Sequence, residues 1–176
     1  MLLSDEQELR CVYIVNTCEY CLETIPQLHE QIENRISEEY ENNVDLKDEA
    51  EDNFRRLISE SIRVLVRSIE ARNDQLYASK LHKMNWLSFE NVEDTSEYIK
   101  VVSKCIQTRT FAIKSGLNPI YQNLFLNKVV GAMTDQFLKQ LFRIKKVSDA
   151  SAHQFQLDLE ELKNTLLYLP CLQQNG

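Results

Sequence analysis

Glycine and proline are scarce in this chain, whose 176 residues include three of each. Turns between strands usually consume these residues, together with Asn-Gly and Asp-Gly pairs. The chain has no Asp-Gly pair, and its one Asn-Gly pair is terminal, at Asn175-Gly176. The composition therefore disfavours a sheet protein and favours a few long helices joined by short loops.

Long apolar runs are also missing. No stretch approaches the ~20 residues that a membrane-spanning helix needs, and the start, Met-Leu-Leu-Ser-Asp-Glu, lacks the features of a signal peptide. The five cysteines, at positions 11, 18, 21, 105 and 171, do not have the spacing of a disulfide framework. These features predict free thiols in a reducing, cytosolic environment, and a protein that reaches membranes only through its partners.

Familiar catalytic motifs are absent as well, including glycine-rich phosphate loops, Gly-x-Ser-x-Gly and His-Glu-x-x-His. Cys18-x-x-Cys21 resembles a redox pair or half of a zinc site, but no second Cys/His pair accompanies it. The histidines, at 29, 82 and 153, are scattered. The sequence therefore predicts no enzyme, metal or cofactor and two cysteines that are small core residues. A metal or redox bundle is the alternative.

Charge is distributed unevenly within a net −7. Residues 1–60 carry 16 acidic and 5 basic side chains, whereas residues 61–176 carry 11 and 15. An acidic chain predicts no nucleic-acid partner. We interpret the small basic cluster, Lys139, Arg143, Lys145 and Lys146, as compensation of a helix dipole rather than as a phosphate site.

The first predicted helix begins near Asp5, because Ser4 and Gln7 form a capping-box pattern, and it runs to about Glu39. Pro26 lies within it, so either one helix bends there or a second helix begins there. Its apolar residues alternate in steps of three and four, as in a helix packed lengthwise on its neighbours. They are Cys11, Ile14, Cys18, Cys21, Ile25, Leu28 and Ile32.

An acidic loop over residues 40–45, with Asp45 as N-cap, precedes a second helix over residues 46–72. The centre of this helix, residues 57–69, is apolar nearly all round, which predicts the central element of the core. A break at Asn73-Asp74, a short helix over residues 75–83 and a loop over residues 84–93 follow. The apolar anchors of this loop are Trp86, Leu87 and Phe89.

Three more helices are predicted, over residues 95–115, 119–144 and 149–169. Their start signals are Asp94 with Glu97, Asn118-Pro119, and Ser148, and the first ends at Gly116 as C-terminal cap. Pro170 ends the last helix. Their apolar faces comprise Tyr98, Val101, Val102, Cys105, Thr108 and Ala112; Tyr121, Phe125, Val129, Met133, Phe137, Leu141 and Ile144; and Phe155, Leu159, Leu162, Leu166 and Leu169.

The predicted fold is therefore all-α: an elongated helical bundle of five long helices and one short helix. We expect one domain over residues 1–176, with a flexible tail over residues 171–176.

A second stripe lies beside the apolar seam of the first helix, formed by Leu9, Tyr13, Asn16 and Tyr20. Tyrosine is enriched in binding hot spots. The stripe therefore predicts either a second intramolecular contact or a partner-binding face. Trp86 presents the same choice, between an anchor of its loop and an exposed contact.

Several short matches in one order give the chain a resemblance to the Vps fifty-three subunit family of the Golgi-associated retrograde protein (GARP) tethering complex. The resemblance covers about residues 10–170. It rests on Val15-Asn16-Thr17-Cys18-Glu19-Tyr20-Cys21-Leu22, Ile58-Ser59-x-Ser61-Ile62-x-x-Leu65-Val66, Lys83-Met84-x-Trp86, Gln140-Leu141-Phe142-Arg143, Leu157-Asp158 and Leu162-Lys163.

This resemblance implies a fragment of a long helical rod of the multisubunit tethering complex type. It implies a role in tethering endosome-derived vesicles at the trans-Golgi network, on the cytosolic face of that compartment and of endosomes. The implied partners are the other subunits of GARP and of the related endosomal recycling complex, with SNARE proteins or small GTPases as further partners. The alternative is a generic helical adaptor or scaffold unrelated to tethering.

Overall fold

The computed structural model describes residues 2–36, 47–87, 92 and 94–171. Across these residues every regular element is a helix, which confirms the predicted all-α bundle. The five long helices are α1 (Asp5–Glu33), α2 (Lys47–Ser79), α3 (Glu97–Gly116), α4 (Pro119–Leu141) and α5 (Asp149–Tyr168). Two 3₁₀ turns, η2 (Leu81–Lys83) and η3 (Leu169–Cys171), complete the described structure.

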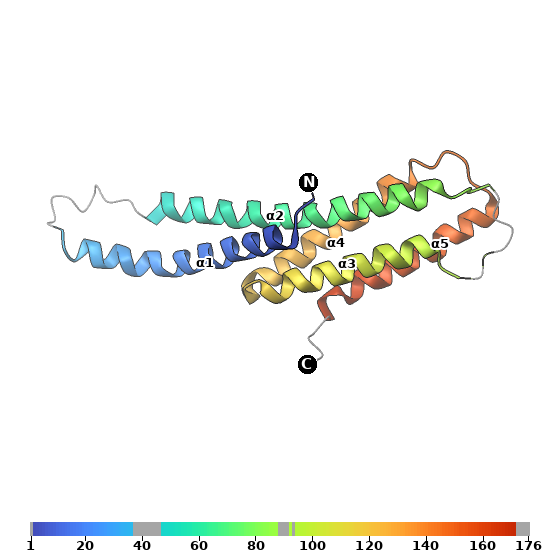
Figure 1. Cartoon of the computed structure of the whole chain (residues 1–176). Helices are drawn as coiled ribbons and strands as arrows, with labels where there is room; N and C mark the ends of the chain where they lie inside the picture. Colours follow the sequence, from blue (N-terminus) through green and yellow to red (C-terminus); the bar gives the residue numbers. More distant parts are fainter. Residues whose placement is uncertain (1, 37–46, 88–91, 93, 172–176) are drawn as a thin grey trace.

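The molecule is elongated, and α1 and α2 form an antiparallel hairpin along much of its length (Figure 1). The far part of this hairpin projects as a two-helix arm, while α3, α4 and α5 gather beside the other half of α2. The prediction that α2 is the central element is confirmed, because α2 packs against α1, α3 and α4. Its residues 62, 65 and 69 have no exposed surface.

The capping box that begins α1 forms as predicted. Ser4 Oγ accepts from the backbone N–H of Gln7 at 3.2 Å, and Ser4 N–H donates to Gln7 Oε1 at 2.9 Å. One continuous helix runs through Pro26 and ends at Glu33 instead of Glu39. The predicted seam is partly wrong, because Ile14 and Leu28 are exposed. The buried face is rotated by about one position, onto Glu8, Val12, Val15, Cys18, Glu19 and Ile25.

The predicted break at Asn73-Asp74 and the separate helix after it are wrong. α2 continues through both residues to Ser79, and η2 supplies the short element that follows. The side chain of Asn73 is fully buried, with its amide donating to the sulfur of Met133 at 3.0 Å. Tertiary packing against α4 therefore overrides the turn preference of the Asn-Asp pair.

The α3–α4 corner forms at the predicted residues but by a different local geometry. α3 begins at Glu97, after Ser96 instead of Asp94, and its buried face omits Thr108 and Ala112 in favour of Ile99, Ile106 and Ile113. Gly116 is the last helical residue and does not have a positive φ, so it is not a left-handed cap. A Cβ there would lie 3.1 Å from Val12 Cγ1, and glycine therefore permits close approach of α1.

The last two helices follow the sequence more closely. Asn118 caps α4 with Pro119 in its first turn, and the predicted buried face of α4 is confirmed at Phe125, Val129, Met133 and Phe137. Ser148 caps α5, as predicted. On α5, Leu159 is exposed and Asp158 is buried in its place. The predicted loop over residues 40–45 with Asp45, the anchor Phe89 and the tail beyond Cys171 lie outside the described residues.

Candidate interaction surfaces

The α1 stripe is mostly open to solvent in the bundle. Tyr13 and Tyr20 are 58% and 66% exposed, and Leu9 is 47% exposed. Ile14, next to Tyr13, is 43% exposed and adds apolar surface to the same region of α1. Side chains this exposed are not packed in a second layer against the bundle, an arrangement that is one of the two predictions for the stripe. Their role in binding a partner stays a prediction.

Asn16 belongs to the bundle rather than to the open part of that stripe. Its amide Nδ2 donates to the carbonyl of Gly116 at 2.8 Å, and its Oδ1 accepts from the backbone N–H of Asn118 at 2.8 Å. One side chain of α1 thereby satisfies both backbone groups at the corner between α3 and α4. One turn further along α1, the hydroxyl of Tyr121 donates to the carboxylate of Glu19.

A buried carboxylate sets the orientation of the start of α1. Glu8 accepts from the hydroxyl of Ser68 at 2.7 Å and from Arg72 at 3.2 Å, both on α2. Arg109 of α3 lies 2.6 Å from Asp5 and 3.5 Å from Glu8. Because a buried charge is costly unless it is paired, this network holds the Val12 face inward. Because the Val12 face of α1 points inward, Tyr13 and Tyr20 on the other side of the helix are exposed.

A shallow apolar hollow of about 250 Å³ lies beside the stripe, between the first turns of α1 and the end of α3. Its lining is apolar at Leu9, Val12, Ala112, Ile113 and Gly116 and charged at Asp5, Glu8 and Arg109. The close approach that Gly116 permits therefore leaves a depression whose rim is shared with the exposed stripe.

Trp86 is 5% exposed and anchors its loop, as one of the two sequence interpretations had it. Its indole N–H donates to the carbonyl of Leu81 at 3.2 Å, and its ring lies 4.3 Å from that of Phe155 between centroids. Its carbonyl accepts from Ser148 N–H at 3.2 Å and from the hydroxyl of Ser151. Leu87, the next predicted anchor, is 58% exposed.

Asp158 is the structural residue that the sequence interpretation missed. Its side chain has no exposed surface, and its Oδ1 accepts from the backbone N–H of Ser96 at 2.8 Å and from Gln154 at 3.1 Å. It thus caps α3 from α5. Burial, and after it the negative charge of Asp158, raises the pKa of Tyr98. A sequence signal existed, since Asp158 lies four residues before Leu162 on the buried face.

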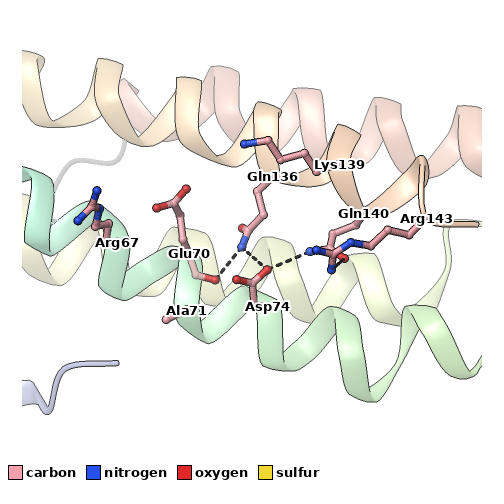
Figure 2. A pocket seen from close by; sticks show the side chains of 8 residues that line it. All are labelled: Arg67, Glu70, Ala71, Asp74, Gln136, Lys139, Gln140 and Arg143. Carbon is pink, nitrogen blue, oxygen red and sulfur yellow. Dashed lines mark hydrogen bonds between the residues drawn. The ribbon is translucent and has the colours of Figure 1, made fainter. Parts of the chain in front are cut away.

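A polar groove runs between α2 and α4 (Figure 2). The amides of Gln136 and Gln140 both donate to Asp74 Oδ1 at 2.9 Å, and Gln136 also donates to the carbonyl of Glu70 at 2.7 Å. Three cations, Arg67, Lys139 and Arg143, stand around the same groove. Because two carboxylates lie among them, the groove is a mixed polar contact between helices rather than a pocket for an anion.

Burial raises the pKa of the thiols of Cys11, Cys18 and Cys105. Cys18 is buried and Cys21 half-buried, and burial, with the neighbouring Cys21 as the smaller cause, raises the pKa of the Cys18 thiol. A raised pKa lowers the fraction of reactive thiolate. Among the described residues no group of three or more His, Cys, Asp or Glu side chains is placed to hold a metal ion. None of the described helices is both long and apolar enough to cross a membrane.

The described residues define an elongated all-α bundle with exposed apolar side chains on its helices. No protein-family model matches the chain, and no solved structure matches it. Two curated relatives match almost all of it. Vacuolar protein sorting-associated protein 53 A of Arabidopsis thaliana is 30% identical over 170 residues, which is 97% of this chain and 20% of the relative. The homolog of vacuolar protein sorting-associated protein 53 in Caenorhabditis elegans is 31% identical over 173 residues, 97% of this chain and 21% of the relative.

The chain is thus a homologue of one segment of the vacuolar protein sorting-associated protein 53 family, which confirms the resemblance identified from its sequence. It spans about a fifth of the length of these curated relatives.

Proposed function

We propose that the chain is a structural and interaction segment of a vesicle-tethering complex subunit that acts in endosome-to-Golgi retrograde transport. The observation that carries the proposal is the similarity over 97% of the chain to two proteins whose names associate them with vacuolar protein sorting. The tethering step, the GARP complex and the trans-Golgi and endosomal location come from the sequence resemblance.

The mechanism in this proposal is binding without chemistry. A long bundle holds contact faces at fixed separations, and affinity comes from burying apolar helix surface around a few aromatic anchors. The partners are the other subunits of GARP or of the related endosomal recycling complex. SNARE proteins or small GTPases are further partners on the same cytosolic surfaces of the trans-Golgi network and endosomes.

The contact face that we assign to a partner subunit is the exposed α1 stripe, Leu9, Tyr13 and Tyr20, with the adjoining apolar hollow. Two tyrosines more than half exposed on one helix supply a rigid contact area at low entropic cost. Asn16 supports the face by fixing α1 to the α3–α4 corner. Trp86 contributes only indirectly, because it is buried against Tyr98 and Phe155.

Co-precipitation from cells with the full-length protein tests this function. We expect the native protein to bring down the other GARP subunits, and Tyr13→Ala with Tyr20→Ala to weaken that recovery about tenfold or more, as for hot-spot residues. Tyr168→Ala is the matched control, because Tyr168 is 64% exposed on α5. Circular dichroism and melting of both variants stay near those of the native protein.

Two results would count against the proposal. Recovery of no GARP subunit by the native protein would favour the generic adaptor. Unfolding of the Tyr13→Ala, Tyr20→Ala variant would assign the stripe to the core.

A further inference from the structure

The end of the molecule opposite the arm gathers positive charge that the proposed tethering role does not use. Two segments form this basic end, residues 79–87 around η2 and residues 136–148 at the end of α4. The side chain of His82 lies 2.8 Å from Gln140, and Ser148 donates to the carbonyl of Trp86 at 3.2 Å, so the segments are joined. Between them they contain six cations and no carboxylate.

All six cations of the basic end are exposed: Lys80, Lys83, Lys139, Arg143, Lys145 and Lys146. Arg143 donates to Gln140 at 3.1 Å, and it lines the α2–α4 groove together with Lys139, Glu70 and Asp74. The other four cations of the basic end, all lysines, are not part of that lining. Compensation of the α4 dipole, the interpretation from sequence, accounts for Lys139 in the last turn. It does not account for Lys145 and Lys146 beyond that turn, or for the two lysines beside η2.

Exposed apolar side chains lie among these cations in the sequence of the second segment. Phe142, directly after α4, is 86% exposed, which is the largest exposure of any large apolar side chain among the described residues. Val147 and Leu138 are 46% and 41% exposed. An exposed aromatic side chain that is close in sequence to exposed cations suits the surface of an anionic lipid bilayer, because cations can contact the headgroups while the aromatic side chain enters the apolar region below them.

The distribution of charge along the molecule also favours contact between the basic end and an anionic surface. The arm, which comprises α1 beyond Ile25 and α2 before Ile58, contains six acidic and four basic residues over 26–36 and 47–57. It lies at the opposite end of the long axis from the basic end (Figure 1). An anionic surface therefore attracts one end and repels the other, which directs the basic end toward it. The mixed α2–α4 groove, with Glu70 and Asp74 among its cations, does not offer an acidic peptide a comparable site.

We propose that the basic end docks directly on the anionic surface of a lipid bilayer, with Phe142 inserted between headgroups and Lys145 and Lys146 in contact with lipid phosphates or carboxylates. This contact is additional to partner-mediated recruitment and replaces the expectation that the protein reaches membranes only through partners. It leaves the α1 stripe, on another part of the molecule, free for a partner subunit.

Sedimentation of the purified protein with vesicles tests the proposal without any partner subunit. We expect binding to vesicles of phosphatidylcholine and phosphatidylserine, weaker binding as salt rises, and little binding to phosphatidylcholine alone. Lys145→Glu with Lys146→Glu reduces the affinity about tenfold or more. The control, Lys104→Glu with Lys128→Glu, makes the same charge change at exposed positions of α3 and α4 and reduces it far less.

Insertion is tested separately by tryptophan emission. In Phe142→Trp, the emission of the new fluorophore shifts to the blue on anionic vesicles, whereas that of Tyr168→Trp, at a position of α5 that is 64% exposed, does not shift. Equal binding to neutral vesicles, an equal loss in the control reversal, or no shift for Phe142→Trp would each overturn the proposal. Partner co-precipitation is read independently, so failure here leaves the tethering function standing.

Discussion

The carboxyl group of Asp158 lies inside the bundle at the point where α3 begins. It accepts one hydrogen bond from the backbone of Ser96 and one from Gln154, whose amide also donates to the carbonyl of Asp94 at 2.9 Å. A single residue of α5 therefore satisfies the start of a neighbouring helix that has no side-chain cap of its own. Such groups are expensive to remove, because their partners stay buried and unpaired.

We expect Asp158→Ala to lower the free energy of unfolding by about 2–4 kcal/mol, because the N–H of Ser96 loses its acceptor and the amide of Gln154 loses one of its two acceptors. Urea denaturation followed by circular dichroism measures the change. Glu160→Ala is the control, since Glu160 pairs with Lys163 only on the exposed surface, and it changes stability by less than about 0.5 kcal/mol. Equal stability of the two variants would contradict the capping role.

The buried tyrosines make a prediction about alkaline pH. Burial is the main cause that raises the pKa of Tyr77 and of Tyr98, and the carboxylates of Asp74 and Asp158 add to it. In the unfolded chain these hydroxyls titrate near the ordinary value of about 10. Above that pH the unfolded state loses protons that the folded state keeps, so stability falls as pH rises, by up to about 1.4 kcal/mol per pH unit for each tyrosine.

Urea midpoints measured between about pH 9 and 12 check this slope. Tyr77→Phe removes one of these titrations and keeps the ring packed 6.3 Å from that of Phe137, so its slope should be shallower. Tyr168→Phe, at an exposed position, should leave the slope as in the native protein. A Tyr77→Phe slope equal to the native one would show that other groups cause the alkaline loss.

At the scale of the helix, α1 is unusual because Pro26 lies in its interior and the helix continues. The proline has no N–H to donate to the carbonyl of Leu22, and its ring crowds that turn. Nearby, Thr24 donates from its hydroxyl to the carbonyls of Tyr20 and Cys21, at 3.1 and 2.9 Å. Pairing with α2 holds α1 together across this weak point.

We expect Pro26→Ala to stabilise the arm, raising the free energy of unfolding by about 1–3 kcal/mol, because the helical hydrogen bond to Leu22 is restored. Urea denaturation and the helical circular dichroism signal both report it. Gln27→Ala, a neighbouring exposed position, should change stability by less than about 0.5 kcal/mol. A loss of stability in Pro26→Ala would mean that a bend at the proline is needed for the α1–α2 contact.

At the scale of the whole molecule, burial is concentrated in one half. The last buried residue of α1 is Ile25, and among the described residues of α2 burial begins at Ile58. The arm beyond these positions therefore consists of two helices that pack mainly on each other, while the rest of the bundle encloses a shared core. Regions with few buried apolar contacts open at lower free energy than the global fold.

Hydrogen exchange followed by mass spectrometry should reveal this division. We expect amides of α1 after Ile25 and of α2 before Ile58 to exchange on the order of 100-fold faster than those of residues 62–69, because the arm opens without unfolding the core. The α1 segment from Val12 to Cys18, which packs in the core, is an internal reference. Uniform protection along both helices would show that the arm and the core unfold together.

The sequence alone determined the class of fold, the approximate positions of the five long helices and several of their starts. These features depend on local properties: the scarcity of turn residues, the capping pair Ser4 and Gln7, and the Asn118-Pro119 start. The family resemblance also came from the sequence. The exposure of Tyr13 and Tyr20 did not, because the apolar residues of α1 permit more than one rotation about its axis.

Only the tertiary structure decided that rotation. The pairing of Glu8 with Ser68 and Arg72 joins residues about 60 positions apart in the chain, and no local pattern encodes it. The same holds for the continuation of α2 as one helix through Asn73-Asp74, which depends on packing against α4. It also holds for the capping of α3 by Asp158, which depends on α5. The basic end is a further case: its cations lie on two separate segments, and folding makes them one surface because the His82–Gln140 and Ser148–Trp86 contacts bring those segments together.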